Sequence, residues 1–346
     1  MNEEEKNIVS PLAVVIVLNW NGEEVIRCCL ESLREQTFKG FKVIVVDNAS
    51  TDRSPEIVSR EFPEFELLRF EKNYGFAEGN NLGISHVWDK YPGTKYVALL
   101  NNDTSARPEW LEKLVDAMEK NENCGAAASK LLCWDGEMKP QFVDSAGDIF
   151  FKHGLAGKRG FGELSENYTV TEPIFGACAG AAIYRSDMLR EIGLLDEDFF
   201  CYNEDVDLCF RIRLSGRNII FVHDAEVWHR VSYSAKPFSD RVIYWAKRNS
   251  FWVLVKNLPA KLFFRYFFSI ICYNMLSDVR WLLGGRFKPV LKGRWDAIIG
   301  LRKMLAKRKE IQSSRKISTE ELDSWIIRQT PWFVSLRRNV KKVIGN

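Results

Sequence analysis

Three apolar runs, each ending in polar residues that lead into a helical pattern, constrain the fold of this chain more than any other feature. The runs cover residues 12–18, 42–46 and 65–70, and the polar segments that follow them begin at Asn19, Asp47 and Asn73. Continuous runs of branched apolar residues are typical of strands buried on both faces. Strands that alternate with helices favour parallel pairing. The sequence therefore predicts an α/β fold with a mostly parallel, Rossmann-like sheet that helices flank on both faces.

A fourth apolar run, residues 97–100, ends in Asn101, Asn102 and Asp103. Ligands of open α/β sheets bind at the carboxyl ends of the strands. A carboxylate at that edge is a suitable oxygen ligand for Mg²⁺ or Mn²⁺ that bridges a diphosphate. The alternative is an Asx turn in which Asp103 caps the helix expected over residues 108–118.

Asp47 also follows a predicted strand, so a parallel sheet would gather Asp47 and Asp103 at one edge. Asp47 could accept hydrogen bonds from a nucleobase or ribose, or it could only form a turn. Asn73 and Gly75 could let the backbone pass close to a nucleotide, or they could form a tight turn before the next helix. GxGxxG does not follow the first strand and GxxxxGK[ST] is absent, which argues against a dinucleotide dehydrogenase and a P-loop enzyme.

A cluster of carboxylates, Glu204, Asp205 and Asp207, precedes a helix predicted over residues 208–215. Some of these groups could cap the helix, and a general base is the further role that three carboxylates suggest. His229, one of only four histidines, ends an extended run over residues 225–229. It could complete a metal or diphosphate site with Asp103, or it could be an ordinary core side chain.

The charge of the chain divides into two parts. The 346 residues carry a net charge of +3, but residues 258–346 hold 19 Lys and Arg against 6 Asp and Glu, and the preceding residues hold 30 against 40. We therefore expect a domain over residues 1–257 and a basic helical extension over residues 258–346. A basic extension attracts either nucleic acid or an anionic membrane surface. Because no nucleic-acid motif accompanies the charge, we expect the membrane surface and no nucleic acid.

The extension begins with an apolar stretch, residues 262–273, that Arg265 interrupts. A transmembrane helix needs roughly 20 predominantly apolar residues, so this stretch predicts an interfacial helix. The cluster at residues 302–309 would contact anionic lipid headgroups; the alternative is a helical hairpin packed on the first domain. The eight cysteines form no CxxC pair and residues 1–10 do not form a signal peptide, so we expect a cytoplasmic protein, peripheral at the inner face of the cell membrane.

The motifs in their order along the chain resemble family 2 glycosyltransferases of the GT-A fold, particularly the rhamnosyltransferase-like branch. The resemblance covers about residues 12–258, and its combination of motifs is specific although each one alone is weak. It is carried by Leu18-Asn19-Trp20-Asn21-Gly22, Val46-Asp47-Asn48-Ala49-Ser50-Thr51-Asp52, Asn73-Tyr74-Gly75-Phe76, Asn101-Asn102-Asp103 and Asn203-Glu204-Asp205-Val206-Asp207-Leu208.

This resemblance implies an inverting transfer of a sugar from a nucleotide-diphosphate donor. Asp205 resembles the catalytic base of a motif that also includes Glu204. Asp103 resembles the last residue of the metal-binding DxD-like motif, and His229 a histidine that helps to hold Mg²⁺ or Mn²⁺. The donor-binding residues that it implies are Asn19, Asn21, Asp47, Asn73, Gly75, Asn102 and Arg248. For Arg248, contact with diphosphate or acceptor stands beside the alternative of a solvated helical face.

Two departures from the family pattern refine the expected activity. Asn101 stands where many relatives have the first carboxylate, so metal binding is expected to depend on the donor diphosphate. The QxxRW motif of processive synthases is absent, which favours transfer of one sugar. The branch suggests L-rhamnose from dTDP-rhamnose and a saccharide or polyprenyl-linked acceptor. The alternatives are another UDP- or GDP-sugar, or a non-catalytic module that binds nucleotide sugars.

Overall fold

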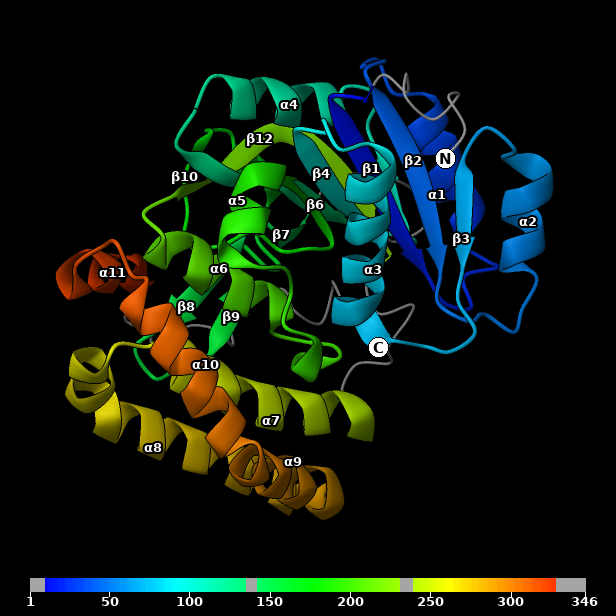
Figure 1. The fold of residues 1–346 in the computed structure, drawn as a ribbon. Coiled ribbons are helices and arrows are strands. Elements are labelled where there is room, and N and C mark those ends of the chain that lie inside the picture. Colours follow the sequence, from blue (N-terminus) through cyan, green and yellow to red (C-terminus); the bar gives the residue numbers. More distant parts are fainter. Residues whose placement is uncertain (1–9, 135–141, 231–238, 328–346) are drawn as a thin grey trace.

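A computed structural model describes residues 10–134, 142–230 and 239–327, and its core is a ten-stranded mixed sheet (Figure 1). The main path through the sheet has the order β10-β12-β6-β11-β4-β1-β2-β3. Its strands are β1 (Ala13–Asn19), β2 (Phe41–Asp47), β3 (Glu66–Arg69), β4 (Tyr96–Asn101), β6 (Cys124–Cys133), β10 (Glu172–Pro173), β11 (Ala181–Arg185) and β12 (Asn218–His229). Two short strands, β5 (Thr104–Ala106) and β7 (Val143–Ser145), pair with β12 and β6.

Strands β1 to β4 are parallel, as the sequence predicts. In their register Asn19 lies opposite Asp47, and Leu18 lies opposite Asn101. The polar residues that follow these strands are therefore gathered at one edge of the sheet. This confirms the expected Rossmann-like arrangement of the first half of the chain.

The second half of the sheet is mixed, because β11 runs antiparallel to both of its neighbours, β4 and β6. The extended run predicted at residues 225–229 is the end of a longer strand, β12, whose register is irregular between Phe221 and Glu226. The end of β12 pairs with β5, so that His229 lies opposite Thr104. This pairing brings His229 next to the end of β4.

Helices cover both faces of the sheet, and side chains alternate between the two faces along each strand. In β1, Val15 and Val17 belong to the hydrophobic cluster beneath α1 (Ile26–Arg34), α2 (Ser54–Glu61) and α4 (Trp110–Glu119). Val14 and Ile16 belong to the other cluster, with α3 (Gly75–Lys90), α5 (Ser186–Ile192) and α6 (Glu204–Leu214). The α/β architecture follows from this two-sided burial.

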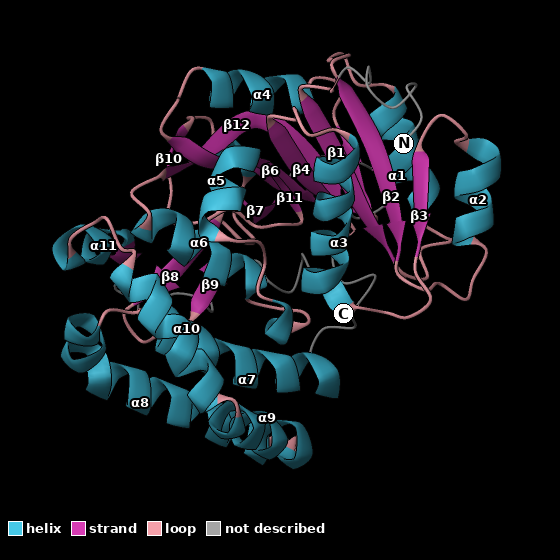
Figure 2. Ribbon diagram, in the orientation of Figure 1, coloured by secondary structure: helices cyan, strands magenta, loops and turns pink. Residues whose placement is uncertain are grey.

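A group of C-terminal helices packs against the second cluster (Figure 2). These helices are α7 (Asp240–Asn257), α8 (Ala260–Leu283), α9 (Phe287–Ile299), α10 (Leu301–Ser313) and α11 (Thr319–Trp325). The helices join the domain core through Leu262, Ala297, Met304 and Leu322. This packing corresponds to the helical alternative weighed for the extension. The boundary at residue 257 stays a prediction, and residues 328–346 of the extension lie outside the described residues.

The last described residues form a strand of a small second sheet. Its order is β13-β8-β9, and the strands are β13 (Ile326–Ile327), β8 (Asp148–Phe151) and β9 (Ala156–Lys158). Ile326 pairs with Phe150 in parallel register. Among the helices in the described ranges, none has the length and apolar composition needed to cross a bilayer.

Candidate active site

The carboxyl edge of the parallel strands is held together by amide side chains. Asn19 is fully buried, and its side-chain nitrogen donates to Oδ1 of Asp47 at 3.2 Å and to Oγ of Ser54 at 2.8 Å. Its oxygen accepts a hydrogen bond from Nδ2 of Asn102 at 2.8 Å. A Cβ atom at Gly22 would lie 2.2 Å from that oxygen. Asn19 and Asn102 thus fix the loop geometry around Asp47, while direct donor contact by either residue stays a prediction.

Asn21 and Asp47 lie in the loops that this amide network joins. Asn21 has a φ of 52°, and its Oδ1 accepts from the backbone N–H of Thr51 at 2.8 Å. The carboxylate of Asp47 is buried, with Nε of Arg69 at 4.0 Å. The structure therefore places both predicted donor-binding residues at the same sheet edge.

Asn73 and Gly75 connect this edge to the loop that precedes α6. Asn48 donates to Oδ1 of Asn73 at 3.2 Å and to the carbonyl of Gly75 at 2.9 Å. Gly75 has a φ of 77°, and a Cβ there would lie 2.5 Å from the carbonyl oxygen of Phe200. The close backbone approach that the glycine allows is made here by the protein's own loop. Contact of Asn73 or Gly75 with a nucleotide stays a prediction.

His229 links two carboxylates at the end of β12. Its Nε2 lies 3.3 Å from Oδ1 of Asp103, and its Nδ1 lies 2.9 Å from Oδ2 of Asp144. Asp144 also accepts from Nζ of Lys158 at 2.7 and 2.8 Å. The predicted pair of Asp103 and His229 is therefore assembled, and Asp144 fixes the orientation of the imidazole.

The electrostatics of this chain favour a protonated imidazole. Burial by itself would lower the pKa of His229, but Asp103 and Asp144 outweigh it and raise that pKa to about 9. Burial would likewise raise the pKa of Asp144, but Lys158 and His229 hold it well below its usual range. A metal ion binds only the neutral imidazole, so it would have to displace this proton.

The chemistry of this pair fits a hard divalent cation. Carboxylate oxygen and imidazole nitrogen are both protein ligands of Mn²⁺, and Mg²⁺ typically takes one or two carboxylates together with water and substrate phosphates. Within the part of the chain that the structure describes, Asp103 and His229 are not joined by a third His, Cys, Asp or Glu in a set that could hold a metal. The remaining ligands would come from the donor diphosphate and water.

The predicted catalytic carboxylates lie in the first turn of α6, which begins at Glu204 and not at residue 208 as the sequence predicted. The helix can begin among these carboxylates because negative charge is favourable at a helix N-terminus. Oδ1 of Asp205 accepts from the N–H of Val206 at 2.8 Å, and Oδ2 accepts from the N–H of Ala179 at 3.4 Å. Ala179 lies between Gly176 and Gly180 in the segment before β11, which places Asp205 beside that segment.

Burial makes these carboxyl groups harder to ionise. It raises the pKa of Asp205, and burial together with the charge of Asp205 raises the pKa of Glu204 well above its usual value. Asp148 on β8 behaves in the same way, first through burial and then through Asp205. The charge of Lys158 acts in the opposite direction on both Asp148 and Asp205. Lys158 therefore links the two groups of the site electrostatically, because its ammonium also binds Asp144.

The loop before α6 is held in a strained conformation. Phe200, Tyr202 and Asn203 have φ values of 63°, 73° and 67°, a region that costs a residue with a side chain roughly 1–2 kcal/mol. The side-chain nitrogen of Asn249 donates to three carbonyls of this loop: Phe199 at 3.0 Å, Cys201 at 2.9 Å and Tyr202 at 2.7 Å.

Arg248, the residue before Asn249 in α7, also binds this loop. Its Nη2 donates to the carbonyls of Asp198 at 3.0 Å and Phe199 at 2.8 Å, and its guanidinium lies over the ring of Trp252. The alternative of a solvated helical face is therefore wrong for Arg248. A contact between Arg248 and the donor or acceptor stays a prediction.

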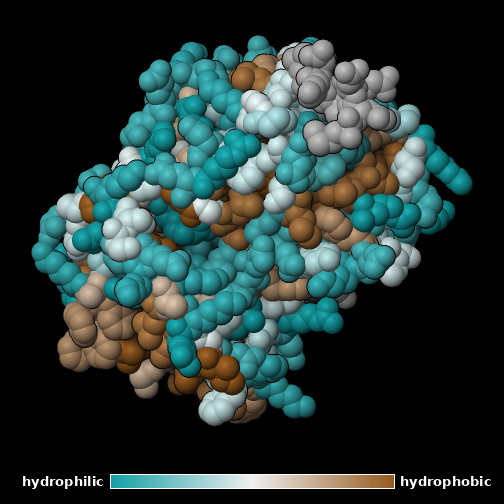
Figure 3. All heavy atoms as spheres, viewed as in Figure 1, coloured by the Kyte–Doolittle hydropathy of each residue, from teal (hydrophilic) through white to brown (hydrophobic). Residues whose placement is uncertain are grey.

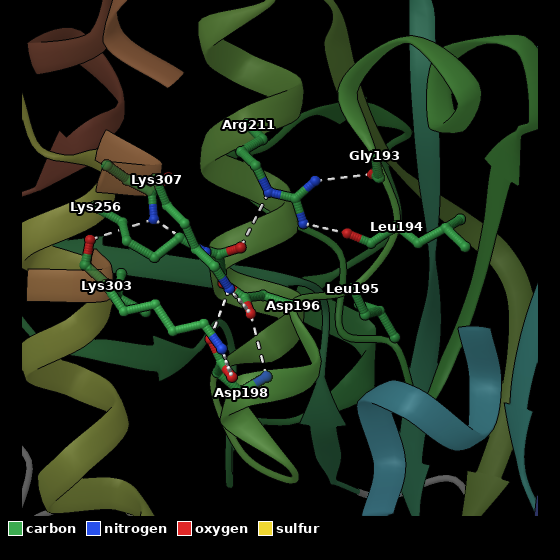
Figure 4. Close-up of polar contacts among 12 residues, drawn as sticks. Gly193, Leu194, Leu195, Asp196, Asp198, Arg211, Lys256, Lys303 and Lys307 are labelled. Atoms are coloured by element: carbon green, nitrogen blue, oxygen red, sulfur yellow. Dashed lines mark hydrogen bonds and ion pairs between the residues drawn. The ribbon is translucent and has the colours of Figure 1, made fainter. Parts of the chain in front are cut away.

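A second set of ion pairs fixes the start of this loop to the C-terminal helices (Figure 4). Lys256 of α7 pairs with Asp196, and Lys307 of α10 lies 2.5 Å from Asp196 and 2.7 Å from Asp198. Lys303 lies 2.6 Å from Asp198. The contacts tie the extension directly to the segment that leads to Asp205.

The same contacts correct the expectation that the basic side chains at residues 302–309 contact lipid headgroups. Lys303 and Lys307 pair with carboxylates of the protein, and Arg308 donates to the carbonyls of Val255 and Leu258 at 2.7 Å each. Three of the basic side chains in this cluster therefore bind within the molecule. Arg302 and Lys309 remain exposed.

Sequence reasoning missed Asp144, Asp148 and Lys158, which the structure adds to the site. These residues lie on short strands whose pairing depends on contacts with distant parts of the chain. The available signal is that Asp144 directly follows Phe142-Val143 in an apolar segment, where an unpaired carboxylate would be costly.

Three curated relatives are glycosyltransferases by name. An uncharacterised glycosyltransferase of Haemophilus influenzae is 32% identical over 124 residues, which are 35% of this chain and 37% of the relative. The N-acetylglucosaminyl-diphospho-decaprenol L-rhamnosyltransferase of Mycobacterium tuberculosis is 25% identical, with 64% of this chain and 80% of the relative aligned. Rhamnosyltransferase WbbL of Escherichia coli is 23% identical, with 71% and 94% aligned. The chain thus spans little more than a third of the first relative and most of the other two.

Solved structures share the fold at low sequence identity. GalNAc-T7, solved with UDP, GalNAc and Mn²⁺, matches with a TM-score of 0.63 and 13% identity over 98% of this chain and 61% of that chain. S. aureus TarS 1–349, solved with UDP-GlcNAc, matches with a TM-score of 0.55 and 16% identity over 90% and 89%. These similarities show that the fold is that of the GT-A glycosyltransferases.

The sequence provides the assignment itself. Residues 14–193, more than half of the chain, match glycosyl transferase family 2 over the part that builds the sheet edge with Asn19, Asp47 and Asp103. The rhamnosyltransferase relatives agree with the branch that the motifs resemble. The chain belongs to glycosyl transferase family 2.

Proposed function

We propose that the protein transfers one sugar from a nucleotide-diphosphate donor to an acceptor hydroxyl, with inversion at the anomeric carbon. The observation that carries the proposal is the 3.3 Å contact between Asp103 and His229, which come from distant parts of the sequence. Strand pairing brings these two ligand types to the sheet edge where ligands of such folds bind. Asp205, the proposed base, is linked to them through Lys158.

The proposed step is a single displacement. A divalent cation on Asp103 and His229 would supply positive charge where the leaving diphosphate gains negative charge. The acceptor oxygen forms a bond to the anomeric carbon while the bond to the donor phosphate breaks, and the nucleotide diphosphate leaves with that electron pair. Asp205 takes the acceptor proton. Burial raises the pKa of Asp205, and a carboxylate with a raised pKa is a stronger base once it is ionised, which supports this role.

For the donor, we propose L-rhamnose carried by dTDP, with Asp47 binding the nucleoside. The support is that two relatives, which are 25% and 23% identical to this chain, are rhamnosyltransferases by name. Another UDP- or GDP-sugar remains the second candidate, because solved relatives of the fold hold UDP, UDP-GlcNAc and GDP-Man. Mn²⁺ is present in two of these structures, which supports Mg²⁺ or Mn²⁺ as the cofactor.

For the acceptor, we propose a saccharide on a polyprenyl lipid, with the protein peripheral at the inner face of the cell membrane. The name of the Mycobacterium tuberculosis relative describes such an acceptor for that enzyme. The absence of QxxRW supports transfer of a single sugar. A non-catalytic module that binds nucleotide sugars is the competing class, and it would tolerate loss of Asp205.

Nucleotide release tests the proposal. The purified protein is incubated with dTDP-rhamnose, UDP-glucose, UDP-galactose or GDP-mannose, with and without Mn²⁺ and with a polyprenyl-diphosphate-linked N-acetylglucosamine acceptor. We expect metal-dependent release from one donor, and its loss in Asp205→Asn. Tight donor binding without release from any donor, in the presence of this acceptor and of membrane extract, would favour the binding module.

A further inference from the structure

The outward face of α8 is apolar along its whole length. The side chains of Phe268 and Leu283 are 82% and 85% exposed, and that of Phe264 is 74% exposed. Spacings of three and four residues place them on one side of the helix. The members of this stripe are Phe264, Phe267, Phe268, Ile271, Met275, Leu276, Val279 and Leu283. Leu262 and Ile270, the two buried residues of α8, face the protein.

Helix α9 has the same two-sided construction. Its inner face packs closely against α7, where a Cβ at Gly293 would lie 2.8 Å from the carbonyl oxygen of Tyr244. Its outer face includes Trp295, which is 65% exposed. That face consists of Phe287, Leu291, Trp295, Ile298 and Ile299. The inner face already anchors α9, and among residues 10–134, 142–230 and 239–327 the outer apolar stripe is largely exposed.

Helices α8 and α9 contact each other. Arg294 of α9 pairs with Asp278 of α8 at 2.9 Å and donates to the side chain of Asn274 at 2.9 Å. In Figure 3, hydrophobic side chains gather along the lower edge of the molecule, where Figure 1 places α8 and α9. We call the thirteen residues of the two stripes the α8–α9 face.

The charge around the α8–α9 face identifies its partner. Residues 260–313 contain twelve Lys and Arg and only three Asp and Glu. Asp278 pairs with Lys247 and Arg294, and Asp296 pairs with Lys292. Seven of the basic residues also pair with carboxylates of the chain, namely Lys261, Arg265, Arg286, Lys292, Arg294, Lys303 and Lys307. The basic side chains exposed to solvent include Arg280, Lys288, Arg302 and Lys309. A second copy of this face would bring like charges together, whereas an anionic lipid surface offers apolar chains and negative headgroups at once.

We infer that the α8–α9 face inserts into the headgroup region of an anionic bilayer and lies in its plane. This inference rests on the proposed function only for the acceptor, which the same bilayer would carry. Helix α9 packs on α7, and α7 holds the loop before Asp205 through Asn249. Since packed helices lie about 8–10 Å apart, the α9 and α7 layers would place the loop before Asp205 roughly 16–20 Å from the lipid surface.

Vesicle binding of the full chain tests the inference. We expect co-sedimentation with vesicles of phosphatidylglycerol and phosphatidylcholine, weaker binding to pure phosphatidylcholine, and weaker binding at high salt. The variant Phe268→Glu with Trp295→Glu should bind at least tenfold less, because both side chains are exposed and the new charges oppose insertion. Leu164→Glu with Val170→Glu, at exposed apolar positions outside this face, is the matched control and should bind like the wild type.

Other outcomes distinguish this inference from the proposed function. Equal loss of binding in the control, or binding that ignores lipid charge, would overturn it. So would a wild-type dimer in gel filtration that the face variant dissociates, since a second copy would then occupy the face. Vesicle binding with no nucleotide release from any donor would leave the docking intact and count against the transferase. Release of nucleotide by the face variant with a short water-soluble acceptor, at the wild-type rate, would support separate docking and catalysis.

Discussion

At the residue scale, Asp205 is the group on which the proposed chemistry depends most. General-base catalysis contributes about 10²–10⁴-fold to a rate, so Asp205→Asn should lower kcat by at least about 100-fold while donor affinity changes little. The measurement is nucleotide release under saturating donor, together with calorimetric binding of the donor. Asp187→Asn changes an exposed aspartate in the first turn of another helix, α5, and serves as the control. Near-normal turnover in Asp205→Asn would exclude this base.

The pH dependence of stability provides a second test, at His229. Its pKa is raised to about 9, above the unfolded value near 6.5, so its stabilising contribution is complete below pH 6.5 and is lost as pH rises through 9. The shift corresponds to about 3 kcal/mol. Metal-free wild type should therefore lose more unfolding free energy between pH 6 and 9.5 than His229→Gln. Urea denaturation at both values measures this difference, and parallel losses in the two proteins would contradict it.

Metal binding should show the opposite dependence on pH. Because a cation bound at the proposed site would displace the proton of His229, Mn²⁺ affinity in the presence of nucleotide should increase as pH rises from 6.5 toward 9. Titration calorimetry in buffers of different ionisation enthalpy would detect the released proton. Affinity that is flat across this range, or unchanged in His229→Gln, would remove the histidine from the metal site.

At the scale of elements, the loop before α6 depends on α7 for its conformation. Asn249→Ala removes three hydrogen bonds to a loop with three positive φ values, at a cost of about 1–3 kcal/mol. The carbonyl of Phe199 keeps its bond from Arg248, whereas those of Cys201 and Tyr202 lose the amide donor. We expect kcat to fall at least tenfold with little change in the KM for the donor, since the loop positions Asp205. Arg241→Ala, at an exposed position on the same helix, is the control. An unchanged kcat in Asn249→Ala would mean that the loop holds its shape without α7.

The elements themselves were largely predictable from the sequence where the signal is local. The run at residues 97–100 predicts a buried strand, and β4 forms there because both of its faces are covered. The pairing of β5 with β12, which places His229 beside Asp103, depends on partners far apart in sequence. Local sequence patterns do not indicate that Asp103 and His229 are neighbours; only the family resemblance suggested it. The position of Lys158 had no such signal, because a lysine that pairs with a carboxylate looks in sequence like one that faces water.

The extension illustrates the same limit on prediction. Its basic composition suggested contact with lipid headgroups, whereas Lys303 and Lys307 pair with Asp198 and Asp196. The apolar stretch at residues 262–273 was visible in the sequence, but the second stripe on α9 became recognisable only once its inner face was seen against α7. Charge counts predict that a segment is basic, and packing decides which of its charges remain available.

At the scale of the whole molecule, the ion pairs between α10 and the loop of Asp196 should contribute to acid stability. Burial alone would raise the pKa of Asp196, but Lys256 and Lys307 outweigh it and lower that pKa to about 2. A depressed pKa gives stability that is present above the unfolded value near 3.8 and is lost as pH falls through 2. Lys307→Ala should therefore move the acid-unfolding midpoint to higher pH. Lys292→Ala, which removes an exposed pair within α9, should leave it unchanged.

The connection between Asp196, Asp198 and α10 also limits how such proteins can be recombined. The family match ends at Gly193, three residues before the first of these carboxylates. The ion pairs to α10 are therefore made by a segment outside the matched region. A chimera that joins this catalytic region to the C-terminal helices of a relative would leave Asp196 facing a foreign side chain. Exchange of the C-terminal helices would therefore require that the acidic loop be transplanted with them.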